Sequence, residues 1–152
     1  MSEQNKLIAR RHAEEVLSQG NLGLVDEIFA SDFVGHAPSG ETHGPEAMKQ
    51  FVSALRRAFP DLRVTVEDQI AEGDKVTIRW TSRGTHTGEF QGMPPTGKQM
   101  TMTAMTLARI ANGKIVEAWT ETDTLGMLQQ LGAIPAPAKE GIPGIVGRRM
   151  ER

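Results

Sequence analysis

The chain has 152 residues, with 17 basic and 19 acidic side chains and a formal net charge of −2. This length is typical of one domain with a substantial core, and the mixed charges lack the basic patch that nucleic-acid binding usually requires. The absence of cysteine excludes disulfides, thiol nucleophiles and thiolate metal sites.

The amino-terminal segment, residues 1–11, is polar and has none of the apolar stretch that marks a signal peptide. The sequence also contains no run of about 18 apolar residues, the length that a membrane-spanning helix needs. We therefore expect a soluble, cytoplasmic protein without a membrane partner.

Helices are predicted in the first 60 residues. Apolar residues at helical spacing predict a helix over residues 5–19, with His12 on its charged, solvated face, and a shorter helix that Asn21 can cap. Residues 32–36 are predicted to be extended and residues 37–44 to form turns. Another helix begins at Pro45, whose missing N–H is harmless in a first turn, and ends at Pro60.

Beyond Pro60 the apolar period changes to two, which indicates strands. One hairpin joins residues 62–67 to 76–81, and a second joins 99–110 to 114–123 across Asn112 and Gly113. A short helix over residues 124–131 completes a domain that spans residues 1–132. A Pro/Gly-rich arm or tail follows over residues 133–152.

This order of elements predicts an α+β fold. Helices come first and antiparallel strands follow, so the helices are expected to pack on one face of a curved antiparallel sheet and to leave a cavity between the two layers.

Two histidines are candidates for acid–base chemistry in that cavity. Alternation along residues 76–86 places His86 on the same face as Trp80, where a neutral imidazole could transfer protons near neutral pH. His36 follows a short apolar segment and could face the cavity from the helical side. The alternatives are a rim position for His86 and a structural hydrogen bond to a loop for His36.

The last strand places a carboxylate beside a tryptophan. Its odd positions share one side, and they are Ile115, Glu117, Trp119, Glu121 and Asp123. Apolar surroundings raise the pKa of a carboxyl group toward the range that suits removal of a proton from carbon. Alternatively, Asp123 caps the final helix.

The motifs of metal and cofactor sites are missing from the sequence. His36, His43 and His86 have no paired spacing such as H-x-x-x-H, and neither a P-loop nor a dinucleotide-type glycine fingerprint occurs. We therefore expect catalysis, if any, to be acid–base chemistry with no metal and no cofactor.

Three segments together carry a resemblance to a known family: FVGHAP at 33–38, GTHTGEFQGMPPTGK at 84–98 and ANGKIVEAWTETDTLGMLQQLG at 111–132. The chain resembles the SnoaL-like polyketide cyclases, or ester cyclases, from about residue 5 to 132. The resemblance implies the cone-shaped fold of the nuclear transport factor 2-like superfamily.

The resemblance also implies a reaction: ring closure by intramolecular aldol condensation of a polyketide-like or other carbonyl compound, without a cofactor. Asp123 matches the acid/base position, and His86 and His36 are the histidines expected to assist. The predicted substrate pocket contains Trp80, Met102 and Trp119.

Two further expectations accompany this interpretation. A non-catalytic small-ligand-binding or stress-related protein of the same fold is the alternative function. A homodimer is expected to form through the convex sheet face, which carries exposed threonines and few charges.

Overall fold

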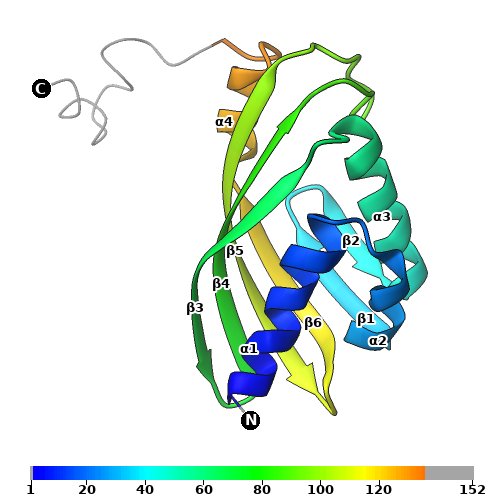
Figure 1. Ribbon diagram of the computed structural model, residues 1–152, viewed down its shortest axis with the longest axis vertical. Coiled ribbons are helices and arrows are strands. Elements are labelled where there is room, and N and C mark those ends of the chain that lie inside the picture. The colour runs from blue at the N-terminus through cyan, green and yellow to red at the C-terminus, as the bar shows by residue number, and fades with distance from the viewer. Residues whose placement is uncertain (1, 136–152) are drawn as a thin grey trace, which may run out of the picture.

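The structure is a computed structural model and describes residues 2–135. Figure 1 shows a strongly curved sheet with the helices α1 and α3 on one side of it. The predicted α+β cone is therefore confirmed. The proposed tail lies outside the described residues from residue 136 onward.

Within the described residues, six strands form one sheet in the order β2-β1-β6-β5-β4-β3. Their bounds are β1 Phe29–Ala37, β2 Gly40–His43, β3 Arg63–Glu72, β4 Lys75–Thr85, β5 Gln99–Ala111 and β6 Lys114–Thr122. Both predicted hairpins are present, as the antiparallel pairs β3–β4 and β5–β6. The prediction missed β2 and the parallel pairing of β1 with β6.

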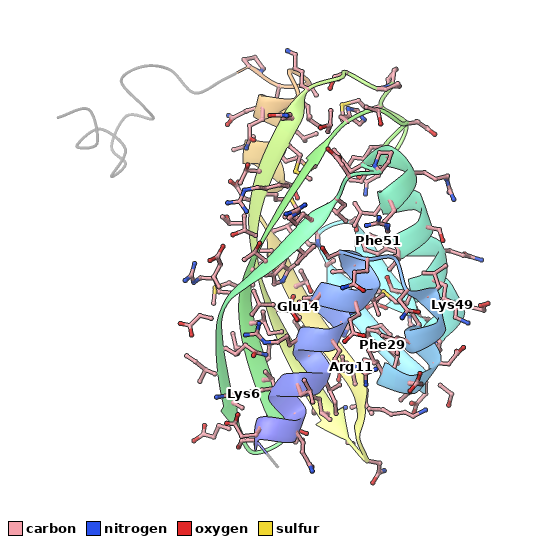
Figure 2. The ribbon with its side chains drawn as sticks, in the orientation of Figure 1. Lys6, Arg11, Glu14, Phe29, Lys49 and Phe51 are labelled. Carbon is pink, nitrogen blue, oxygen red and sulfur yellow. The ribbon has the colours of Figure 1, made fainter. Side chains whose placement is uncertain are left out.

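The helices cover the inner side of this sheet. Their bounds are α1 Ser2–Arg11, the π-helical segment η1 His12–Leu17, the 3₁₀ turn η2 Leu22–Leu24, α2 Val25–Ile28, α3 Gly44–Ala58 and α4 Thr124–Gln130. Figure 2 shows charged side chains along the first helix, among them Lys6, Arg11 and Glu14. No helix within residues 2–135 has the length and apolar character needed to span a bilayer.

The core fills the space between the helices and the sheet. Val16 of η1, Val52 of α3, Phe59 at the end of α3 and Val76 of β4 have no exposed surface. Burial of each such side chain contributes roughly 1.5–3 kcal/mol to the stability of the fold, compared with leaving it exposed.

A β-bulge in β6 changes which residues face inward. Arg109 of β5 pairs with Glu117, but the next residue, Ile110, pairs with Ile115, so β6 has one extra residue at Val116. An extra residue moves the following side chains to the opposite face. Ile115 therefore faces inward, whereas Glu117 lies on the outer face.

Candidate functional site

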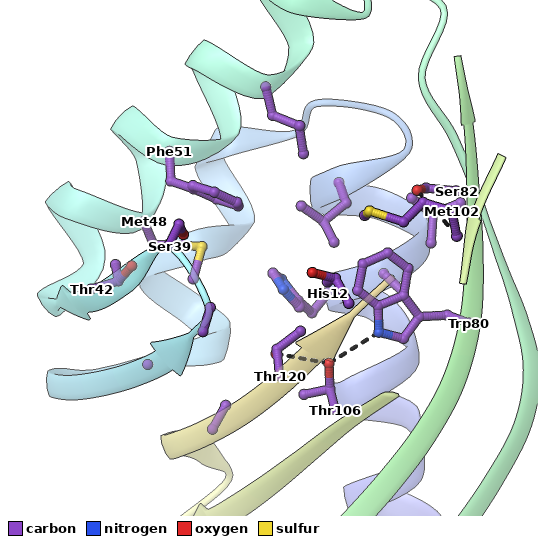
Figure 3. Close-up of a pocket in the computed structure, with 18 of the residues that line it drawn as sticks. His12, Ser39, Thr42, Met48, Phe51, Trp80, Ser82, Met102, Thr106 and Thr120 are labelled. Carbon is purple, nitrogen blue, oxygen red and sulfur yellow. Dashed lines mark hydrogen bonds between the residues drawn. The ribbon is translucent and has the colours of Figure 1, made fainter. Parts of the chain in front are cut away.

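A cavity of about 320 Å³ lies between the helices and the inner face of the sheet. Its walls are mainly apolar, with contributions from Phe33 of β1, Met48 and Phe51 of α3, and Ile78 of β4. Figure 3 shows Met48 and Phe51 on one side of this space and Trp80 and Met102 on the other. This volume lies within the range of small-molecule sites.

The polar groups of the cavity wall are mostly uncharged. No Asp, Glu, Lys or Arg is among the lining residues of the part that the structure describes. The polar lining consists of hydroxyl groups, the amide of Gln91 and the residues His12 and His36. A ligand here would meet an apolar surface with a few directional hydrogen-bonding groups.

Trp80, Thr106 and Thr120 form a hydrogen-bonded row on the inner face of the sheet (Figure 3). The indole Nε1 of Trp80 donates to Oγ1 of Thr106 at 3.0 Å, and the two threonine hydroxyls are 2.9 Å apart. Cross-strand pairing places Thr106 opposite Thr120. These three donors make only two bonds among the described residues, so one hydroxyl hydrogen of the threonine pair is available to a ligand.

His12 lies at the start of η1 and lines the cavity. Its Nδ1 is buried and has no hydrogen-bond partner within residues 2–135. Burial lowers the pKa of His12 to about 4, so the imidazole is neutral at pH 7.

The solvated position predicted for His12 is wrong. His12 is three residues after Ala9 and four before Val16, both of which are buried, and residues at these spacings share one helix face. The same spacing in the sequence was the signal that could have identified it.

Asp123 caps helix α4 and does not line the cavity. Its Oδ1 accepts a hydrogen bond from the backbone N–H of Gly126 at 3.0 Å, and the side chain is exposed. Its neighbours Thr122 and Thr124 both line the cavity, so Asp123 stands beside the cavity wall. The structure thus contains the predicted cap, and the catalytic role of Asp123 stays a prediction.

His36 borders the cavity, but both of its ring nitrogens are already paired. Nε2 is 2.8 Å from Oε2 of Glu117, and Nδ1 is 3.2 Å from Oε2 of Glu41. The hydrogen bond to Glu117 raises the pKa of His36, and the same contact lowers the pKa of Glu117. In this structure the imidazole stabilises the contact between β1, β2 and β6.

Trp119 lies on the outer face of the sheet and outside the predicted pocket. Its indole stacks on the His36 ring with centroids 5.5 Å apart and an interplanar angle of 14°, and it is 37% exposed. The prediction that Trp119 lines the pocket is therefore wrong. Alternation correctly groups Trp119 with Glu117 on one face of β6, but this face is the outer one and not the cavity side. Trp80 and Met102, by contrast, line the cavity.

His86 is completely buried beyond the end of β4 and is not among the lining residues. Its Nδ1 accepts a hydrogen bond from the backbone N–H of Thr96 at 3.2 Å, and its ring packs on Phe59 with centroids 5.4 Å apart. These contacts hold the loop that precedes β5. Proton transfer by His86 stays a prediction.

Within residues 2–135, no cluster of three or more His, Cys, Asp or Glu side chains is arranged to hold a metal ion.

Comparisons with known proteins agree with this architecture. Residues 7–131 match the family described as SnoaL-like polyketide cyclase. The nogalonic acid methyl ester cyclase of Streptomyces nogalater is 35% identical over 125 residues, which are 80% of this chain and 92% of that protein. The aklanonic acid methyl ester cyclase of Streptomyces peucetius is 33% identical over 147 residues, 93% of this chain and 98% of that protein.

A solved structure supports the same fold. The crystal structure of IdmH from Streptomyces antibioticus superposes with a TM-score of 0.75 at 36% sequence identity. The match covers 85% of this chain and 99% of IdmH.

Proposed function

The chain belongs to the SnoaL-like polyketide cyclase family, and on this basis we propose that it closes a ring in a polyketide ester by intramolecular aldol condensation without a cofactor. Two relatives that match most of the chain are named as cyclases of nogalonic and aklanonic acid methyl esters. The proposed substrate is therefore a polyketide that carries ketone groups and an ester.

The hydroxyl pair Thr106 and Thr120 is the observation that carries this proposal. An aldol closure places negative charge first on an enolate oxygen and then on an alkoxide oxygen. A donor already fixed in a site without bulk water stabilises such charge effectively. Trp80 holds this threonine pair in place, and the unused hydroxyl hydrogen of the pair is such a donor in the cavity.

The reaction itself is an isomerisation. A base removes a proton from a carbon flanked by two carbonyl groups, and the resulting enolate carbon attacks a ketone carbon of the same molecule. One carbon–carbon bond forms, the new alkoxide takes up a proton, and the product has the mass of the substrate.

Asp123 is the proposed base, on the strength of its match to the family's acid/base position. Oδ1 is used by the cap, but Oδ2 makes no hydrogen bond among the described residues. Its place between Thr122 and Thr124, which line the cavity, supports a position at the edge of a bound substrate.

A homodimer is part of the same proposal. Met105 of β5 is 51% exposed and Trp119 of β6 is 37% exposed, and the register pairs Met105 with Glu121 next to Trp119. Neighbouring strands thus present large apolar side chains on the outer sheet face, which a second copy of the chain would cover.

The function is tested by incubating the purified protein with aklanonic acid methyl ester in the absence of any cofactor. Liquid chromatography with mass detection should show a new species of unchanged mass. Thr120→Val keeps the shape of the side chain and removes its hydroxyl, so it should slow the reaction; Thr103→Val, at an exposed position of β5, is the matched control. Binding of the ester without formation of an isomer would support a non-catalytic binding protein instead.

A further inference from the structure

We propose that His12 is a catalytic residue of the cavity's helical wall, where its imidazole donates a hydrogen bond to a substrate oxygen during ring closure. The proposal rests on the proposed function, because it assigns a second hydrogen-bond donor to the same reaction. His12 stands on the helix side of the cavity, and the threonine pair stands on the sheet side (Figure 3).

The position of the ring determines which nitrogen can reach a ligand. Nδ1 is buried and has no partner within residues 2–135, while the ring lines the cavity, so we take Nε2 as the nitrogen on the open side. A proton on Nδ1 would be a buried donor without an acceptor, which is costly. We therefore place the proton on Nε2, where the N–H faces the cavity.

Packing fixes the orientation of this imidazole, whose Nδ1 makes no hydrogen bond to any residue that the structure describes. The ring meets Phe29 edge to face, with centroids 4.9 Å apart and an interplanar angle of 89°. Buried polar atoms without partners are rare in folded proteins, and each needs an explanation. A hydrogen bond from Nε2 to a ligand gives this imidazole a polar partner and accounts for a histidine at this position.

The local helix geometry supports a functional position. His12 is the first residue of the π-helical segment, in which the Ser18 N–H donates to the carbonyl of Ala13, five residues earlier. Such segments are rare and occur often at functional sites. Here the segment directs His12, Ala13 and Leu17 to the cavity together.

The charge state of His12 suits a donor better than a base. Burial holds its pKa at about 4, and no carboxylate lines the described part of the cavity to counter this effect. The charged residues beside it are paired along the helix, Arg10 with Glu14 at 2.8 Å and Arg11 with Glu15 at 3.4 Å. A neutral imidazole with its N–H toward the substrate can polarise a carbonyl group.

Two donors on opposite walls suit the chemistry. The reaction develops negative charge on two oxygens, the enolate oxygen and the new alkoxide oxygen. Among the donors of the cavity, the proposed Nε2–H of His12 and the O–H of the Thr106–Thr120 pair lie on opposite walls (Figure 3). Each donor can serve one of the two oxygens.

The test combines turnover with a binding measurement that does not depend on turnover. His12→Phe keeps a planar ring and removes both nitrogens, His12→Gln retains a donor, and His43→Gln changes an exposed histidine as the control. With aklanonic acid methyl ester, His12→Phe should lower kcat by roughly 10²-fold, in the range for loss of one such donor. His12→Gln should recover part of this loss.

The binding measurement uses methyl anthraquinone-2-carboxylate, a planar carbonyl compound that cannot undergo the reaction. Binding should shift the ¹⁵N resonances of His12 in the wild-type protein, and His12→Phe should weaken the affinity about tenfold. Unchanged turnover and unchanged affinity in a folded His12→Phe protein would overturn the inference and leave the proposed function intact. Absence of turnover in the wild type would overturn the proposed function. In that case a shift of the His12 resonances on binding would still support the donor role of His12, and no shift would overturn the donor role too.

Discussion

The rings of His12 and Phe29 meet edge to face with centroids 4.9 Å apart, and this contact holds a neutral imidazole against the cavity. The buried Nδ1 of His12 makes no hydrogen bond within the described part of the chain. The helix that carries His12 and the strand that carries Phe29 enclose the same cavity. The position of the imidazole therefore depends on core packing, and protonation of His12 should affect the stability of the protein.

The low pKa of His12 predicts a loss of stability in acid. The ordinary pKa is 6.5 and the folded value is about 4, so the unfolded chain binds a proton between these values and the folded chain does not. The free energy of unfolding should fall by up to roughly 3 kcal/mol as the pH falls through this window. The free energy of unfolding, measured with urea at several pH values in this window, should depend less steeply on pH in His12→Phe than in the wild type. Equal pH dependence in the two proteins would contradict the low pKa of His12.

His36 should show the opposite dependence. Its hydrogen bond to Glu117 raises its pKa above 6.5, so this histidine adds stability below that value, and the contribution disappears as the pH rises through the raised pKa. An NMR titration should place the His36 midpoint above 6.5 in the wild type. Glu117→Gln leaves Glu41 as the remaining facing carboxylate and should move the midpoint down; no change would show that Glu117 is not the cause.

Substitution of Asp123 separates its cap from its proposed chemistry. Asp123→Ala should cost about 1 kcal/mol of stability, and Asp123→Asn should cost little, because Asn caps helices about as well as Asp. If the carboxylate is the base, Asp123→Asn should still lower turnover by ~10²–10⁴-fold. Normal turnover by Asp123→Asn, with its cap intact, would restrict Asp123 to a structural role.

The fold was largely predictable because its signals are local. Helical spacing before Pro60 and alternation beyond it are properties of short segments, and Asn112-Gly113 adopts the positive φ angles of 52° and 76° that such a turn requires. The parallel pair β1–β6 was missed because it joins segments far apart in the sequence. The short strand β2 was missed because its residues, 40–43, lie in a segment whose composition indicates turns.

The candidate site was less predictable for a similar reason. Alternation indicates which residues of a strand share a face, but not which face covers the cavity. Trp80 lines the cavity, whereas Trp119 lies on the outer face. The bulge at Val116 then separates Ile115 from Glu117, although both are odd positions. Such a bulge arises from the pairing of two strands and leaves no clear mark in either strand alone.

The proposed homodimer predicts a species of twice the chain mass of 16.6 kDa in sedimentation at micromolar concentration. Trp119→Glu places a charge on the outer sheet face and should shift the protein to a monomer, whereas Leu7→Glu, at an exposed position of α1, should not. A wild-type protein that sediments only as a monomer would exclude this interface.

The most direct test of the central claim, that a ring closes inside this cavity, compares the wild type with a variant whose cavity is filled. Ala118 lines the cavity from β6, so Ala118→Phe should occupy the space that the substrate needs. Thermal unfolding establishes that the variant is folded. The wild type should convert aklanonic acid methyl ester to an isomer of equal mass, and Ala118→Phe should not. Equal rates of conversion by the two folded proteins would contradict ring closure inside the cavity.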